Sequence, residues 1–147
     1  MKNAIFALLA AAVLSLTTLA AWAEESRPYT EDTVSTVNSI RTKPGMRDAY
    51  MKWLDTSWKT LMEDQKKAGI IVDYAVYEVT PRTSQDPDLF LVVSYKNMGA
   101  LDNLEDRTEP MMKKLFNSRD QANKAAAERE SLREVIGSQL IRHLILK

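Results

Sequence analysis

Two apolar runs in the middle of the chain constrain its fold most. They are IIVDYAVYEV (residues 70–79) and LFLVVSY (residues 89–95), and the turn-forming stretch PRTSQDPD separates them. Both runs are rich in β-branched and aromatic residues, so they predict an antiparallel β-hairpin. Side chains alternate across a strand, which divides the second run into two faces, Leu89, Leu91, Val93 and Tyr95 against Phe90 and Val92. Both faces are mainly apolar, and this predicts a sheet that is covered on both sides.

The N-terminal stretch MKNAIFALLAAAVLSLTTLAAWA predicts a secretory signal peptide over residues 1–23. A lysine precedes a long apolar run, and the run ends in the small-x-small pattern Ala21-Trp22-Ala23, so we expect cleavage after Ala23. The alternative is an uncut membrane anchor, but serine and threonine interrupt the run and no basic stop-transfer cluster follows it. The expected destination is the bacterial periplasm or the medium.

Composition excludes several classes of function. The chain has no cysteine, which excludes a redox thiol, a structural disulfide and a Cys-ligated metal. Removal of residues 1–23 takes away Lys2 alone among the 20 basic and 20 acidic residues, so the mature part stays near neutral. This balance argues against a nucleic-acid partner or an anionic membrane surface. The remaining length predicts one domain, over residues 33–147.

The first half of the mature chain predicts a leader, a strand and a helix. Residues 24–32 (EESRPYTED) are polar and predict a flexible leader, and residues 34–42 (VSTVNSIRT) predict a strand that Lys43-Pro44-Gly45 ends. From Met46 to about Ala68 the apolar residues follow the helical period, and Gly69 suits a left-handed cap after that helix.

The second half predicts a helical region and a last strand. Asn97 is a candidate N-cap, Pro110 is expected to begin a new helical segment, and Ser118 with Gln121 has the spacing of a capping box. We expect an Ala-rich helix over residues 122–136 until Gly137, and a strand over residues 139–146. The order strand, helix, strand, strand, helix, strand predicts an α+β ferredoxin-like fold, a four-stranded antiparallel sheet with helices on one face.

This architecture leaves one sheet face without helices. The hairpin sequence predicts that Ile, Val, Leu and aromatic side chains would line that face, and a soluble monomer rarely exposes so large an apolar patch. A second copy is the simplest cover, because a two-fold pairing lets one patch bury itself. We therefore expect a homodimer.

The chain resembles the dimeric α/β-barrel superfamily, which includes antibiotic-biosynthesis-type monooxygenases. The resemblance rests on the strand that ends in Lys43-Pro44-Gly45, the helix that opens with MRDAY (residues 46–50), the Ala68-Gly69 exit, the hairpin, and residues 95–100. It implies a ferredoxin-like dimer. It says little about activity, because the superfamily includes small-molecule binders as well as enzymes.

Two polar residues are candidate catalytic groups, Asn38 and His143. Asn38 lies mid-strand on a partly apolar face and is similar in position to the asparagine that haem-degrading members of the superfamily place above their cofactor. Those enzymes add a histidine on the second helix, and residues 101–136 contain none, so the sequence departs from the pattern that would imply haem. His143 is the only histidine, which excludes a multi-His metal site, and we expect a half-buried structural residue.

Aromatic residues on the first helix are candidate ligand-binding residues together with Asn38. Tyr50, Trp53 and Trp58 lie on its apolar stripe, and each could equally be a packing residue of the core. The first hypothesis is an exported dimer that binds a small apolar or aromatic ligand between sheet and helices. The alternatives are a cofactor-independent or haem-dependent monooxygenase, in which Asn38 and a tryptophan orient an aromatic substrate, and a domain that only mediates protein contacts.

Overall fold

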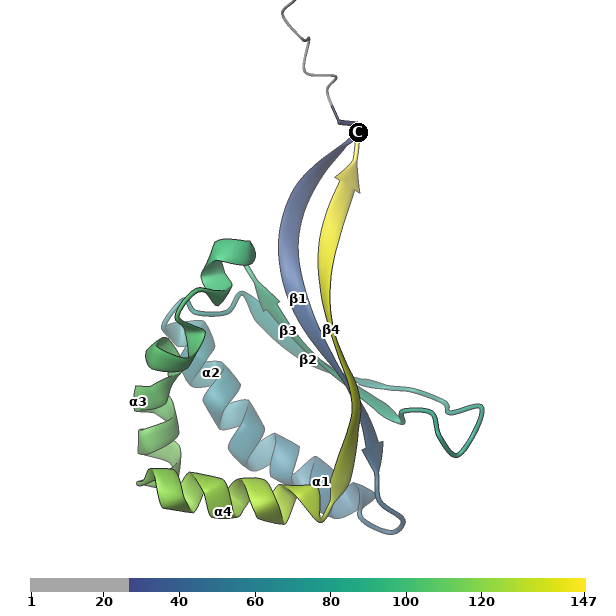
Figure 1. The fold of residues 1–147 in the computed structure, drawn as a ribbon, viewed down its shortest axis with the longest axis vertical. Coiled ribbons are helices and arrows are strands. Elements are labelled where there is room, and N and C mark those ends of the chain that lie inside the picture. Colours follow the sequence, from purple (N-terminus) through teal and green to yellow (C-terminus); the bar gives the residue numbers. More distant parts are fainter. Residues whose placement is uncertain (1–26) are drawn as a thin grey trace, which may run out of the picture.

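The computed structural model describes residues 27–147, so the predicted signal peptide and residues 24–26 of the predicted leader lie outside the described residues. Four strands and four α-helices follow one another in the order expected from the sequence (Figure 1). The elements are β1 (Tyr29–Thr42), α1 (Arg47–Trp53), a π-helical segment (Leu54–Trp58), α2 (Lys59–Lys67), β2 (Asp73–Glu78), β3 (Leu89–Tyr95), a short 3₁₀ helix (Met98–Leu101), α3 (Leu104–Phe116), α4 (Arg119–Glu130) and β4 (Arg133–Leu146).

The strands form one antiparallel sheet in the order β2-β3-β1-β4. Chain order and sheet order together give the ferredoxin-like topology, and the predicted α+β fold is confirmed. The central pair β1 and β3 aligns Val34 with Tyr95 and Asn38 with Leu91. All helices lie on one side of the sheet, as the ribbon shows (Figure 1).

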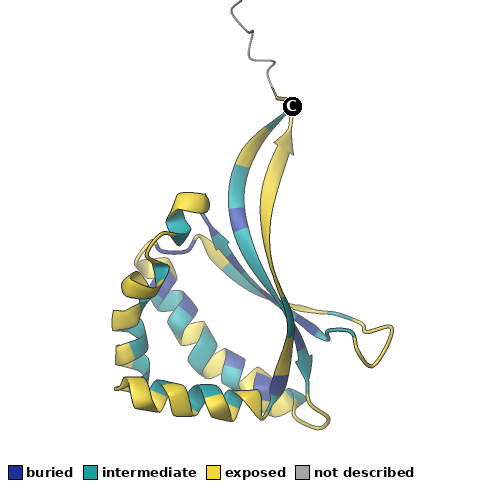
Figure 2. Cartoon of the chain, viewed as in Figure 1, coloured by how far each residue is buried: buried dark blue, intermediate teal, exposed yellow. Residues whose placement is uncertain are grey.

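The core lies between the sheet and these helices (Figure 2). Along β3, buried and half-buried residues alternate strictly, so the predicted division of this strand into two faces is confirmed. Two groups of buried side chains fill the layer. One contains Ile40, Tyr50, Leu54, Leu89 and Leu91, the other contains Met62, Ile70, Ile71, Val93 and Tyr95, and Trp58 packs against both.

The opposite side, which we call the open face, is less apolar than predicted. By alternation it carries Val37, Phe90, Val92, Tyr77 and Ile141, but serines lie among them. The Oγ atoms of Ser35 and Ser94, on the two central strands, are 2.8 Å apart. The expectation of a continuous apolar surface therefore fails at this serine pair, whereas Val37 of β1 and Val92 of β3 are directly paired apolar residues of the same face.

Several predicted boundaries also need correction. β1 begins at Tyr29, so the last four residues of the predicted leader, 29–32, belong to the sheet. Pro110 lies inside α3 rather than at the start of a helix. The Ala-rich helix ends at Glu130, and residues 133–137, predicted as helix and stop, already form β4. Ser118 does cap α4, because its Oγ accepts a hydrogen bond from the Gln121 amide at 3.2 Å.

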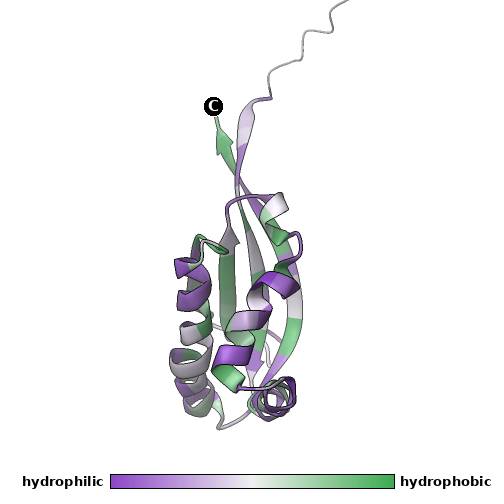
Figure 3. Ribbon diagram, turned by 90° about the vertical axis from the view of Figure 1, so that its left-hand side faces the viewer, coloured by the Kyte–Doolittle hydropathy of each residue, from purple (hydrophilic) through white to green (hydrophobic). Residues whose placement is uncertain are grey.

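The outer ends of β1 and β4 project beyond the rest of the sheet as a two-stranded ribbon, which we call the arm (Figure 1). The arm comprises residues 29–33 and 143–146, because the pairing of β1 with β3 starts only at Val34. Its β4 strand is strongly apolar near the C-terminus (Figure 3). Leu144, Ile145 and Leu146 are 43%, 47% and 78% exposed, so the arm carries apolar surface that this chain leaves uncovered.

Candidate functional site

A cavity of about 210 Å³ opens between the sheet and helices α1 and α4. All the residues predicted as ligand contacts line this cavity. Its lining consists of Asn38, Tyr50, Trp53, Trp58, Leu91, Arg129, Arg133 and Val135.

The turn before α1 positions the first aromatic residue of this lining. Gly45 adopts φ +75°, a left-handed conformation that other residues rarely adopt, and the Met46 amide donates to the Lys43 carbonyl at 2.9 Å. The helix that follows carries Tyr50 inward, where its residue is fully buried. One turn later Trp53 stacks on Tyr50, with ring centroids 5.9 Å apart and planes 4° from parallel.

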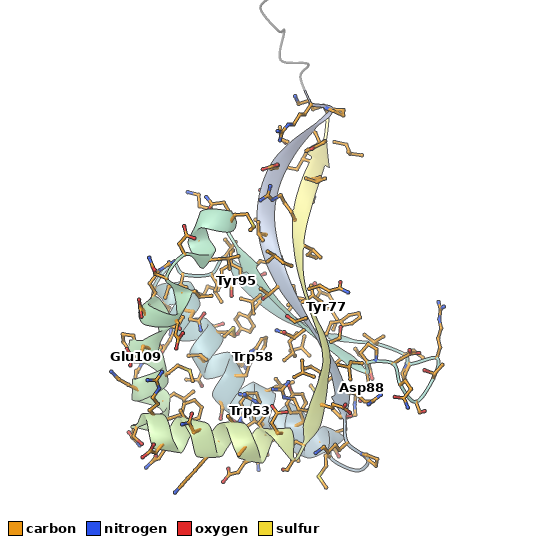
Figure 4. All side chains as sticks on the ribbon, viewed as in Figure 1. Trp53, Trp58, Tyr77, Asp88, Tyr95 and Glu109 are labelled. Atoms are coloured by element: carbon orange, nitrogen blue, oxygen red, sulfur yellow. The ribbon has the colours of Figure 1, made fainter. Side chains whose placement is uncertain are left out.

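The π-helical segment explains why Trp53 and Trp58 share one cavity. In an ordinary α-helix, residues five apart point in directions that differ by about 140°. A π-helical turn bonds residues five apart, and residues so bonded lie on one side of the helix. Here the Lys59 amide donates to the Leu54 carbonyl, which is this wider spacing. Figure 4 shows both tryptophans in the space between helices and sheet.

Two arginines lie against the aromatic residues and complete the lining. Arg129 lies in the last turn of α4, with its guanidinium carbon 4.9 Å from the centroid of the Trp53 ring. Arg133 is the first residue of β4, and its guanidinium carbon lies 5.8 Å from the centroid of the Tyr50 ring. Arg133 also donates to Glu130 Oε1 at 3.0 Å. The two cations therefore rest on the two stacked rings.

Several polar atoms of this lining have no hydrogen-bond partner among residues 27–147. They are the Tyr50 hydroxyl, Arg129 Nε and Arg133 Nε, and all are buried. Burial raises the pKa of Tyr50 to about 12, so the phenol stays protonated and able to donate. The pKa of Arg129 is lowered by two causes. The larger is burial, which disfavours the charged guanidinium, and the second is repulsion by the positive charge of Arg133.

Asn38 is the polar group on the sheet side of the cavity. It lies in β1 between Leu91 of β3 and Ser138 of β4 and is half-buried. Its carboxamide can donate and accept, so a bound molecule could meet either function there. The structure therefore brings Asn38 together with Tyr50, Trp53 and Trp58, as the ligand-binding hypothesis requires.

His143 is not part of this arrangement. It lies in the arm, where its Nδ1 is 2.9 Å from Asp32 Oδ2. Its side chain is 62% exposed, so the expectation of a half-buried residue is wrong for this chain. Asn38 pairs with Ser138, five residues before His143 on β4, and the rise of a strand separates such positions by roughly 16 Å.

The residues of the cavity do not fit haem. No histidine lines it, since the single histidine of the chain lies in the arm. Within residues 27–147 there is also no group of three or more His, Cys, Asp or Glu side chains that could hold a metal ion. No helix in this described region is long and apolar enough to cross a membrane.

A larger cavity, of about 480 Å³, lies elsewhere, in the angle between α3 and α4. Charged and polar side chains of both helices line it, including Glu105, Glu109, Lys113 and Arg119. The Arg119–Glu105 ion pair spans 3.6 Å between side chains that are both more than 80% exposed. Such groups are solvated already, so the smaller aromatic cavity is the better candidate site.

Sequence reasoning missed the two arginines. The Ala-rich helix was expected to continue through Ile136, which would have placed Arg133 on its exposed surface. In the structure the helix ends at Glu130 and the chain reverses, so that Arg133 becomes 8% exposed. The spacing of four residues between two arginines was the available signal, but it is common on solvated helices.

Comparison with known proteins gives the fold. HapK from Hahella chejuensis is similar in structure, with a TM-score of 0.52 and 12% identity over 75% of this chain and 91% of HapK. A dimeric ferredoxin-like protein from an uncultured marine organism has a TM-score of 0.48 and 11% identity, over 80% of this chain and 90% of its own. No family model and no curated protein matches the chain. Topology and structural likeness agree on the ferredoxin-like fold.

Proposed function

We propose that the chain binds a small aromatic molecule in the cavity between its sheet and helices. The observation that carries this proposal is the convergence of Tyr50, Trp53 and Trp58 with Asn38 on one cavity. Ligand cavities combine apolar and aromatic walls with a few polar groups that fix orientation, and this lining has that composition. Trp53 and Trp58 are only half-buried, so part of each indole is available for contact.

The proposal includes a homodimer that acts outside the cytoplasm. Support for pairing comes from the exposed apolar side chains of the arm and from the open face, which the helices of this chain leave uncovered. Support for export comes from the N-terminal sequence alone. Sedimentation velocity at micromolar concentration would test pairing, and a single species with the mass of one chain would contradict it.

A melting-temperature screen tests the ligand proposal. The probes are 1,4-naphthoquinone, 2-naphthamide, 2-naphthoate and palmitate, each at millimolar concentration or at its solubility limit. A ligand at 100 times its dissociation constant stabilises the native state by about 2.7 kcal/mol, which is readily measured. We expect the aromatic probes to raise the melting temperature and palmitate to have less effect.

Two matched variants locate the binding. Trp58→Leu removes an indole of the cavity, whereas Tyr77→Leu removes an aromatic ring from the open face, on the other side of the sheet (Figure 4). The shift caused by an aromatic probe should shrink in Trp58→Leu and persist in Tyr77→Leu. No shift with any aromatic probe, or equal loss in both variants, would contradict the proposal.

A second candidate function is a cofactor-independent monooxygenase that acts on such an aromatic molecule. The observation that favours it is the presence of Asn38 and both tryptophans in one cavity, as this hypothesis requires. Oxygen uptake with 1,4-dihydroxynaphthalene, corrected for its spontaneous oxidation, tests it. Uptake that is absent, or unchanged in Asn38→Ala compared with Ser39→Ala on the open face, would remove the enzymatic version.

A further inference from the structure

The cavity wall carries an excess of positive charge. Its lining, as far as the structure describes it, contains Arg129 and Arg133 and no acidic residue. The nearest counter-ion is Glu130, which bonds Arg133 from outside the lining with a side chain that is 55% exposed. Two guanidinium groups thus share one solvated carboxylate. Burying such an excess is costly unless an anion compensates for it.

The contacts of the two guanidinium groups leave donors without a partner. Each group rests on an aromatic ring, Arg129 on Trp53 and Arg133 on Tyr50. A cation over an aromatic ring interacts with the face of the ring, and this contact uses none of the N–H donors in an ordinary hydrogen bond to an oxygen. The Nε atoms of both arginines are buried and have no partner among the described residues. Arg133 is 8% exposed, so water outside the protein does not satisfy that donor.

Tyr50 adds a third donor to the same wall. Its residue is fully buried, and its hydroxyl also lacks a partner in the described part of the chain. A buried donor without an acceptor costs about 1–3 kcal/mol, so three such donors in residues that line one cavity call for an explanation. Donors of this kind need an acceptor with several lone pairs, and a carboxylate offers them.

We propose that the ligand of this cavity is an aromatic carboxylate, whose acid group binds Arg129, Arg133 and Tyr50 while its ring lies against Trp53 and Trp58. This inference rests on the proposed function, because it names the chemical class of the aromatic ligand. Arginine suits the task, since its planar donors match the two oxygens of a carboxylate. In this arrangement Asn38 lies near the ring of the ligand, and a hydroxyl or carbonyl substituent on that ring would contact it.

Isothermal titration calorimetry with matched pairs of probes tests whether binding depends on the negative charge of the ligand. The pairs are benzoate with benzamide and 2-naphthoate with 2-naphthamide, which keep the ring and remove the negative charge. Charge-assisted hydrogen bonds to a buried cation are strong, so we expect the acid of a pair to bind roughly tenfold or more tightly than its amide. Raising the salt concentration should lower the affinity of the acid alone.

Variants of Arg129 test whether the preference for the acid over the amide arises in this cavity. Arg129→Met keeps most of the apolar stem and removes the charge, and Arg129→Lys retains a charge without the planar fork. Arg119→Met is the control, since Arg119 is 81% exposed on the same helix and lies outside this cavity. The ratio of acid to amide affinity should fall about tenfold in Arg129→Met, fall less in Arg129→Lys, and stay unchanged in Arg119→Met.

The outcomes separate the two proposals. If acid and amide bind equally and Arg129→Met leaves their ratio unchanged, the carboxylate inference is wrong while aromatic binding stands. If neither member of either pair binds, the carboxylate inference is wrong, and aromatic binding fails with it when 1,4-naphthoquinone also causes no shift in melting temperature. Tyr50→Phe provides a further readout with an intact ring, because loss of the hydroxyl should weaken acid binding more than amide binding, a charged acceptor forming the stronger hydrogen bond.

Discussion

The two ends of the paired strands β1 and β4 differ sharply in how their side chains are covered. At one end Ile40 is fully buried, and Arg133 is 8% exposed beside the cavity. At the other end, in the arm, Ile145 is 47% and Leu146 is 78% exposed. Figure 2 shows this contrast along a single pair of strands. Helices cover the first end and nothing in the described chain covers the second.

The two ends therefore contribute to different properties, the cavity end to folding stability and the arm to association between chains. At the cavity end, burial of side chains within the chain stabilises the fold. The unusual feature of this end is that some buried polar donors have no hydrogen-bond partner among the described residues. In the arm, polar contacts such as that between His143 Nδ1 and Asp32 Oδ2, at 2.9 Å, coexist with uncovered leucine and isoleucine. Exposed apolar surface of this kind stabilises the protein only when another surface covers it and removes it from water. Variants at the two ends should therefore change different measured quantities.

The largest expected effect is on folding stability at the cavity end. Ile40→Ala should lower the free energy of unfolding by about 2–5 kcal/mol, because it leaves a void in a fully buried site. Ile145→Ala in the arm should change it by about 0.5 kcal/mol or less when measured at a concentration where single chains prevail. Urea unfolding of both variants makes the comparison, and equal losses would contradict the distinction between the two ends.

The next effect concerns association through the arm. The double variant Leu144→Asp/Ile145→Asp should raise the dissociation constant of the proposed dimer by roughly two orders of magnitude or more, because charges replace apolar contacts. Analytical ultracentrifugation over a dilution series measures it. Thr80→Asp, on the exposed loop between β2 and β3, is the control for added charge. A dimer that survives the double variant unchanged would exclude the arm from the interface.

A smaller effect distinguishes two tyrosines on the helix side of the sheet. The Tyr74 hydroxyl donates to Glu63 at 2.6 Å, so Tyr74→Phe should lower the free energy of unfolding by about 1 kcal/mol. The Tyr50 hydroxyl has no partner among residues 27–147, so Tyr50→Phe should be neutral or slightly stabilising in the absence of ligand. Urea midpoints at pH 7 compare them. A clear loss in Tyr50→Phe would show that its hydroxyl is satisfied in the free protein.

The smallest effect appears at alkaline pH. Burial raises the pKa of Tyr50 to about 12, while an unfolded tyrosine titrates near 10. The hydrogen bond to Glu63 is the main reason that the pKa of Tyr74 also rises to about 12. The unfolded state therefore loses its protons first, and stability present below pH 10 declines as pH rises towards 12. Tyr50→Phe should show a shallower decline between pH 9 and 11 in urea unfolding, whereas Ile145→Ala should keep the original slope.

Local patterns predicted most of the fold. Alternation in LFLVVSY gave the two faces of β3, and Gly45 ended the turn before α1 as its position suggested. The boundary between α4 and β4 could not be predicted, because Val135 and Ile136 continue an Ala-rich helical pattern and only tertiary pairing with β1 draws them into the sheet. The register shift near Ile136 is likewise a product of that pairing.

The cavity was predicted only on its aromatic side. The apolar stripe of the first helix indicated Tyr50, Trp53 and Trp58, but ideal helical spacing would have separated the two tryptophans, and nothing in the sequence specifies the π-helical segment that unites them. The arginines escaped notice because their partner rings lie about eighty residues earlier in the chain. Contacts of such long range are a property of the folded state.

The tip of the arm has a practical consequence for anyone who handles this protein. The Lys147 amide donates to the Pro28 carbonyl at 3.0 Å, so the last residue and the start of the described chain sit together there. An affinity tag or fluorescent fusion joined to Lys147 would crowd the exposed leucine and isoleucine side chains and leave the mouth of the cavity clear. A fused sample could thus report ligand affinity faithfully while giving a misleading molecular mass.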